Sequence, residues 1–162
     1  RTFAKKNSNM MAYSRFKEAI KNDPKYMLPY VEMAKLYASE GKNSEAEESL
    51  TKAISIEPEN VVIMCELGYL YSKTGKTKEA LEILKKAVTK NSYTPSHYYY
   101  AYALSKAGQL KDALSSFDEA IALNPYEPEI YLLRAESYEE SKMHKEAVSD
   151  YKKAFELLMN IK

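Results

Sequence analysis

The stretch of the chain that decides the fold is residues 61–93, VVIMCELGYLYSKTGKTKEALEILKKAVTKNSY. Its two halves each place apolar or small residues at the spacing of one helix face, i, i+3 or i+4, and i+7. These residues are Met64, Leu67, Gly68 and Tyr71 in the first half, and Ala80, Leu84 and Ala87 in the second. Gly75 stands between the halves, where a glycine suits the left-handed end of a helix. The stretch therefore predicts a helix, a tight turn and a second helix.

The same pattern recurs along the whole chain at a period of about 34 residues. Successive copies lie 34, 34, 33 and 34 residues apart. The recurring columns are Ala12, Ala46, Ala80, Ala113 and Ala147; Phe16, Leu50, Leu84, Phe117 and Tyr151; and Ala19, Ala53, Ala87, Ala120 and Ala154. Small residues let two backbones approach closely while large neighbours fill the space beside them. One such helix pair cannot bury both of its faces, so each pair is expected to stack on the next.

The turns support this division and leave no place for strands. Gly41 and Gly108 occupy the positions that match Gly75. The six prolines fall after the second helix of a unit or in the first turn of the next one, where a missing N–H costs little. No window of the sequence shows sustained alternation of apolar and polar residues. We therefore expect an all-α chain.

This pattern resembles the tetratricopeptide repeat family, whose unit has 34 residues. The resemblance implies an all-α, right-handed α-solenoid of stacked antiparallel helix pairs. Four full repeats are expected at 27–60, 61–93, 94–127 and 128–162, together forming one solenoid domain. They follow a partial repeat at 1–26, which would hold the end of a first helix and a complete second helix. Lys142 stands where the family has glycine, and Arg134 where it has leucine.

Both ends of the sequence look incomplete as repeats. The partial repeat lacks most of its first helix, and the fourth full repeat is followed directly by the end of the sequence, without the polar capping helix that solenoids usually need. We expect the chain to be part of a longer protein, the alternative being a natural small protein with imperfect ends. Self-association through these ends is a further expectation.

Composition and motifs argue against several classes of function. The formal net charge is +1, so no overall field would attract nucleic acid. No apolar run approaches the roughly 20 residues of a membrane span, so membrane insertion is not expected. Cys65 is the only cysteine, which fits a reducing compartment, and we expect a cytoplasmic location. Catalytic and metal-binding motifs are absent from the sequence. We therefore expect neither an enzyme, nor a metal site, nor a cofactor.

The resemblance also indicates which residues would face the concave side of the solenoid. In the family, the first helix of each unit lines a groove with a fixed set of positions. Carried over to this chain, the groove is expected to bind a protein or peptide partner through ten residues: Val31, Lys35, Cys65, Tyr69, Lys73, Tyr98, Tyr102, Lys106, Leu132 and Glu136.

The chemistry of this predicted groove favours an apolar ligand. Tyrosine presents a large rigid face and is enriched at interfaces. Replacement of Tyr69 and Tyr102 by alanine is thus expected to weaken partner capture without unfolding the chain. The alternative is that the tyrosines simply pack between adjacent first helices. Some members of the family hold a terminal carboxylate with lysine, arginine and asparagine side chains at fixed positions. This chain has residues such as Glu66 and Tyr99 at those positions, so this mode of binding does not fit.

Three functions remain in view. The leading hypothesis is a non-catalytic interaction module or adapter that binds a partner helix or an apolar peptide segment in its concave groove. The second is a structural spacer or assembly scaffold within a large multi-subunit complex, acting through its ends and its convex side. The third is a set of substrate-presenting repeats of an enzyme whose catalytic domain lies outside this chain.

Overall fold

A computed structural model describes residues 2–90 and 93–159 of the chain. Within these residues there are nine helices and no strand. The helices are α1 (Thr2–Asn22), α2 (Leu28–Ser39), α3 (Asn43–Ile56), α4 (Val61–Lys73), α5 (Thr77–Lys90), α6 (Thr94–Lys106), α7 (Leu110–Leu123), α8 (Pro128–Glu140) and α9 (His144–Met159).

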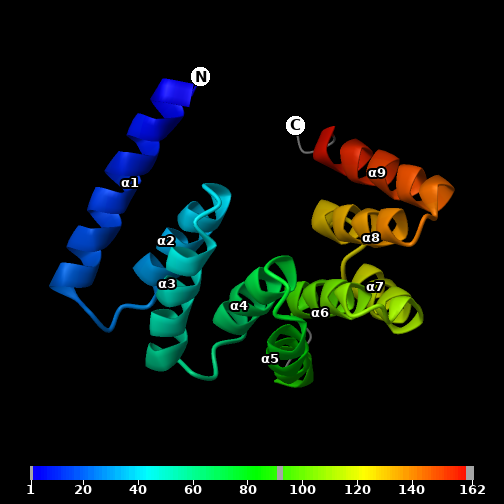
Figure 1. The fold of residues 1–162 in the computed structure, drawn as a ribbon, viewed down its shortest axis with the longest axis horizontal. Coiled ribbons are helices and arrows are strands. Elements are labelled where there is room, and N and C mark those ends of the chain that lie inside the picture. Colours follow the sequence, from blue (N-terminus) through cyan, green and yellow to red (C-terminus); the bar gives the residue numbers. More distant parts are fainter. Residues whose placement is uncertain (1, 91–92, 160–162) are drawn as a thin grey trace.

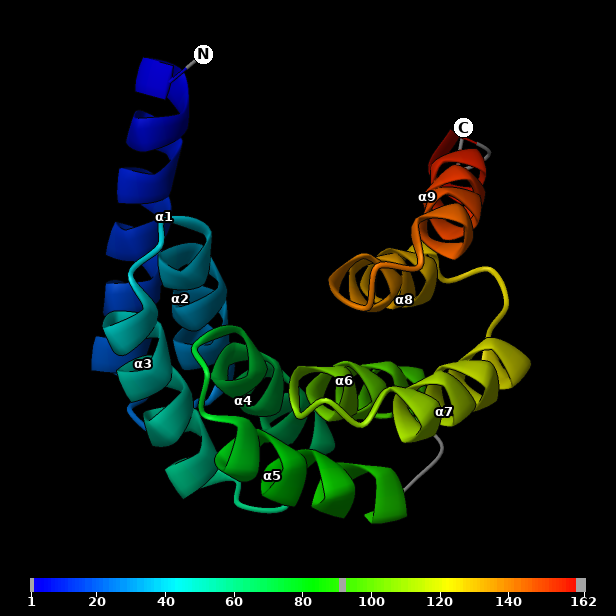
Figure 2. The same cartoon turned by 45° about the vertical axis from the view of Figure 1, so that its right-hand side comes forward.

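The helices form stacked pairs that follow a curve (Figure 1). The pairs are α2 with α3, α4 with α5, α6 with α7, and α8 with α9, and one pair lies in each interval predicted as a full repeat. In Figure 2, α2, α4, α6 and α8 lie toward the inside of the curve, while α3, α5 and α7 lie toward its outside. The predicted fold class, an all-α solenoid of stacked helix pairs, is confirmed.

The turn inside each pair is closed by the same backbone geometry. At the second pair, Gly75 has a φ of 81°, and the N–H of Lys76 donates to the carbonyl of Tyr71 at 2.9 Å. This is the hydrogen bond that a left-handed residue after a helix makes possible. In the fourth pair Lys142 takes this place with a φ of 60°. A side chain in that conformation costs roughly 1–2 kcal/mol relative to an ordinary helical residue, which the packing of α8 against α9 offsets.

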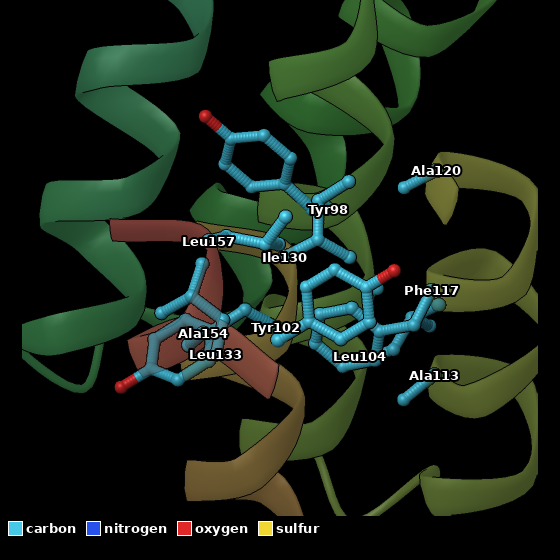
Figure 3. Packing of buried hydrophobic residues seen from close by; sticks show 12 residues of the cluster. Tyr98, Tyr102, Leu104, Ala113, Phe117, Ala120, Ile130, Leu133, Ala154 and Leu157 are labelled. Carbon is cyan, nitrogen blue, oxygen red and sulfur yellow. The ribbon is translucent and has the colours of Figure 1, made fainter. Parts of the chain in front are cut away.

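The core lies between the helices of each pair and between neighbouring pairs. The two alanine columns of the four full repeats are completely buried, with 0% exposure at all eight positions. Leu84 and Phe117, which lie between these alanines, are also at 0%. Figure 3 shows Ala113, Phe117 and Ala120 of α7 pointing toward the largest apolar cluster, which also contains residues of α6, α8 and α9. The small columns thus allow close approach, as the sequence predicts.

Arg134, which replaces a leucine of the family pattern, joins three helices. Its guanidinium donates two hydrogen bonds to the carboxylate of Asp150 on α9, at 2.7 and 2.9 Å, and one to Asp118 on α7 at 3.0 Å. Asp150 is only 6% exposed. A bidentate hydrogen-bonded pair between an arginine and a carboxylate is strong and directional. The departure from the family pattern is therefore compensated by a polar link between the last two helix pairs.

The N-terminal end differs from the prediction for residues 1–26. The resemblance implies the end of one helix and a complete second helix there, but α1 runs without interruption from Thr2 to Asn22. No glycine occurs in this segment to take the left-handed conformation that closes the other turns. Among the described helices α1 contacts only α2, so a turn would gain no packing and a continued helix satisfies more backbone groups. Residues 1, 91–92 and 160–162 lie outside the described part of the chain.

Candidate functional site

The ten residues predicted to form the groove lie on α2, α4, α6 and α8, but they do not share one environment. Four of them belong to the core: Val31, Cys65 and Tyr102 are 1% exposed, and Tyr98 is 5% exposed. This burial argues against direct contact between these four side chains and a partner. Neighbouring helix pairs enclose these side chains, and Tyr102 also borders an open cavity of about 410 Å³ together with Ser72, Lys73, Gly75, Lys106 and Glu136.

The tyrosines fill the space between α4 and α6. The ring of Tyr69 stacks on that of Tyr99, with centroids 4.6 Å apart and planes at 22°, and meets the ring of Tyr102 at 5.7 Å. Tyr98 packs edge-on against Tyr99 at 4.6 Å. The hydroxyl of Tyr102 donates to the Glu136 carboxylate on α8 at 3.1 Å. The packing alternative is the one that applies to this part of the concave side.

The other predicted residues are at least partly accessible and form a charged rim. Lys35 pairs with Glu66 at 3.4 Å, Lys73 lies 3.9 Å from Glu136, and Lys106 pairs with Glu140. Leu132 is half-buried and packs against the largest apolar cluster. Exposed pairs of this kind contribute little to stability. The rim is therefore polar, and its charged side chains can exchange partners at little cost in stability.

A cavity of about 330 Å³ opens between α2, α3 and α4. Its apolar wall comes from all three helices and consists of Ala34, Ala38, Ala46, Leu50, Tyr69 and Leu70. Its polar lining consists of Lys35, Ser39, Asn43, Glu66 and Lys73. Of the ten predicted residues, this cavity brings together Lys35, Tyr69 and Lys73.

The cavity exists because α2 and α6 offer different side chains to α4. Lys35 of α2 stands at the repeat position that Tyr69 holds in α4 and Tyr102 holds in α6. Three residues earlier, α2 has Glu32 where α6 has Tyr99. No aromatic ring of α2 therefore fills the space beside α4, and small side chains such as Ala38 line it instead. Sequence reasoning missed Leu50 and Leu70 as site residues. The signal that could have found the cavity is the change from tyrosine to lysine at the repeat position of Lys35.

Burial perturbs the ionisable groups around the cavity. Glu66 has a side chain 22% exposed, and desolvation raises the pKa of its carboxyl, an effect that nearby Lys35 offsets only in part. Desolvation, with smaller effects from Glu129, Glu136 and Glu66, raises the pKa of Tyr69 to about 12. Desolvation also raises the pKa of Glu129, and the neighbouring Glu127 and Glu136 add to it. The concave side between α2 and α8 is thus richer in buried negative charge than its lysines can balance.

The reactive groups of the chain do not gather at this site. Burial raises the pKa of the Cys65 thiol to about 12, which keeps it protonated and unreactive at neutral pH. Among the described residues, His, Cys, Asp and Glu form no group of three that could hold a metal ion. Nor does any helix in the described ranges have the length and apolarity to cross a membrane.

Comparisons with known proteins agree with this architecture. A family model described as "Tetratricopeptide repeat" matches residues 4–160. No curated protein matches the chain. Among solved structures, MamA is 23% identical with a TM-score of 0.67 over 97% of this chain and 92% of that one. PilW, titled as a widely conserved type IV pilus biogenesis factor, is 21% identical with a TM-score of 0.79 over 98% of this chain and 74% of that one.

A third similar structure is YrrB, titled as a TPR protein with an unusual peptide-binding site. It is 22% identical with a TM-score of 0.62, over 96% of this chain and 81% of that one. At these levels of identity, the three structures establish likeness of fold and nothing more specific.

Proposed function

Because the chain belongs to the tetratricopeptide repeat family, we propose that it is a non-catalytic protein–protein interaction module that holds a partner helix or an apolar peptide segment on its concave side. The family is one of interaction modules, which supports the general function. The observation that supports binding on the concave side is the cavity between α2, α3 and α4, which is apolar inside and polar at its rim. Clefts of this composition are typical of binding sites.

The proposal differs from the sequence-based one in where the partner lies. Tyrosine rings fill the space between Tyr69 of α4 and Tyr99 of α6, so the proposed contact surface lies over α2 and α4. Leu28 and Val62, both exposed on these helices at 44% and 38%, extend that surface beyond the cavity. A partner helix or extended segment would cover these side chains and bury apolar area.

Site-specific photo-crosslinking in cell extract tests this proposal. A photoreactive amino acid is placed at Ser39 or Lys73 beside the cavity, and at Glu48 or Lys86 on the outer helices as matched exposed controls. We expect the two concave positions to crosslink to one segment of the same partner, identified by peptide mapping. Crosslinks that form only from Glu48 or Lys86 would overturn the proposal.

A second candidate function, an assembly scaffold, is favoured by the outer face of α9. Five large apolar side chains lie exposed along it at helical spacing: Val148, Tyr151, Phe155, Leu158 and Met159. The residues of α7 that match Tyr151 and Phe155 are Phe117 and Ile121, and both pack in the apolar cluster that α8 shares. The free face of α9 is therefore of the type that another helix covers inside this solenoid.

Sedimentation velocity separates this second candidate from the first. If the scaffold role applies, the protein associates as its concentration rises, and Phe155→Ser abolishes the association. Lys153→Ser on the same helix, at an exposed polar position, is the matched control. A species that stays monomeric at high concentration would remove self-assembly through α9.

A further inference from the structure

The cavity between α2, α3 and α4 has the size of an anchor pocket for a single side chain. Its volume is about 330 Å³. That is roughly twice the volume of about 150 Å³ that holds one benzene molecule in a closed protein core. A leucine, methionine or phenylalanine side chain fits with space for its backbone at the mouth. A whole helix does not enter, so the remainder of a ligand would lie across the concave surface.

The interior of the cavity selects for an apolar group. Ala46 is 0% exposed and Leu50 is 3% exposed, so the floor is part of the core between α2 and α3. Leu70 at 6% exposure and the ring of Tyr69 supply the wall on α4. A polar group placed against these side chains would lose its hydrogen bonds to water without replacement.

Lys35, Lys73 and Glu66 are the charged residues of the lining, and both lysines already lie beside carboxylates. Lys35 lies 3.4 Å from Glu32 and 3.4 Å from Glu66, so one ammonium group serves two carboxylates. Lys73 is already engaged with Glu136 at 3.9 Å. Glu129 forms no ion pair with any residue that the structure describes. An additional positive charge beside Glu66 would be stabilised by Glu66 and Glu32, whereas an additional negative charge there would meet these two carboxylates.

We propose that this cavity is an anchor subsite for a partner segment that inserts one aliphatic or aromatic side chain and places a lysine or arginine beside it, against Glu66. This inference rests on the function proposed above and assigns the chemistry of the ligand. It excludes the acidic or carboxylate-terminated segments that other members of the fold could hold, because their charge would be repelled. The apolar side chain supplies affinity, and the cation supplies orientation along the groove.

Selection from a random dodecapeptide phage library on the 162-residue chain tests the inference. We expect the selected peptides to be enriched in Leu, Met or Phe together with Lys or Arg, and depleted in Asp and Glu. Synthetic versions of the best peptide, labelled with fluorescein, are then measured by fluorescence anisotropy. Replacement of its apolar anchor by serine, or of its cation by glutamate, is expected to raise the Kd about tenfold or more.

Matched protein variants locate the binding. Ala38 is exposed at the mouth, so Ala38→Leu fills the cavity without disturbing the core, and it is expected to raise the Kd about tenfold or more. Ala122→Leu makes the same change at an exposed position of α7 and is expected to leave binding unchanged. Glu66→Gln is expected to weaken the cationic peptide while leaving the version with an uncharged residue in place of the cation unaffected. Circular dichroism confirms that each variant is folded.

The outcomes separate this inference from the function that it rests on. Peptides that bind equally well to the Ala38→Leu protein, enrichment of acidic or polar peptides, or the absence of any enrichment would overturn the anchor subsite. A change of oligomeric state in Ala38→Leu would identify a second copy as the occupant and would overturn it as well. The crosslinking pattern at Ser39 and Lys73 does not depend on the library, so concave binding of a partner can stand when the anchor subsite fails.

Discussion

Substitution of Gly68 by alanine tests the close approach between α4 and α5. A Cβ atom built on Gly68 would lie 2.3 Å from Cγ of Leu84 and 2.7 and 2.8 Å from its two Cδ atoms. Leu84 is 0% exposed, so its side chain cannot swing into solvent to avoid the methyl group. Ala is nevertheless the better helix former, by about 1 kcal/mol per residue. The sign of the effect therefore depends on which of the two contributions is larger.

We expect the steric contribution to be larger. Extra atoms in a packed core typically cost about 1–3 kcal/mol, and three contacts below 3.0 Å with a fully buried side chain place Gly68→Ala at the upper end. After the helix-propensity gain, the net destabilisation is about 2 kcal/mol. With a urea slope of about 2 kcal/mol/M, the unfolding midpoint falls by about 1 M. Urea titration followed by circular dichroism at 222 nm measures this shift.

A double-mutant cycle makes the result decisive. In a Leu84→Ala background the obstructing side chain is gone, so Gly68→Ala should raise the midpoint through helix propensity alone. Gly75→Ala is the control, because a Cβ there meets no atom within 4 Å and its strain, at a φ of 81°, is independent of Leu84. If Gly68→Ala is as stable as the wild type, or acts with the same sign in both backgrounds, the packing argument is refuted.

Three further predictions concern polar and aromatic groups. Arg134→Ala leaves the buried Asp150 carboxylate unpaired and should destabilise the protein by about 3–5 kcal/mol, whereas Asp118→Asn, at an exposed partner of the same arginine, should change the urea midpoint little. Tyr102→Ala should cost about 3–5 kcal/mol, since Tyr102 is 1% exposed, and a folded variant with an unchanged thermal midpoint would contradict its place in the core. Because the pKa of Glu66 is raised in the folded state, its charge opposes folding above that pKa, and Glu66→Gln should exceed the wild type in urea midpoint at pH 7. That advantage should disappear below the unfolded value of 4.5, where both states of the wild type are protonated, so an equal advantage at pH 7 and pH 4 would contradict the shift.

The fold could be predicted because its determinants are local and repeated. The alanine columns mark close helix contacts, and every one of these positions in the four full repeats is fully buried. The turns follow from residues that adopt a left-handed conformation, including Lys142 in place of glycine. The N-terminal helix could not be predicted in the same way. The family pattern predicts two helices in residues 1–26, but this segment has no glycine to close a turn and α1 contacts only α2 among the described helices, so one helix continues through it.

The candidate site could be predicted only in outline. The family pattern identifies which helices face the concave side, but whether a side chain there meets solvent depends on the neighbouring unit. Tyr69 and Tyr102 occupy the same repeat position, yet Tyr102 is 1% exposed while Tyr69 lines the cavity between α2, α3 and α4, because α2 supplies small side chains beside Tyr69. The raised pKa of Glu66 likewise depends on side chains of neighbouring helices, so it cannot be predicted from a single repeat position.

The uneven filling of the concave side has a mechanical consequence. Bending a solenoid inward compresses the material between adjacent inner helices. Between α4 and α6 this material is a stack of tyrosine rings, which resists compression because packed aromatic cores have few voids. Between α2 and α4 the open cavity lets the first unit tilt before side chains collide. The contact between α2 and α4 is therefore expected to bend more easily than the tyrosine-filled contact between α4 and α6, and a side chain inserted into the cavity would oppose that bending.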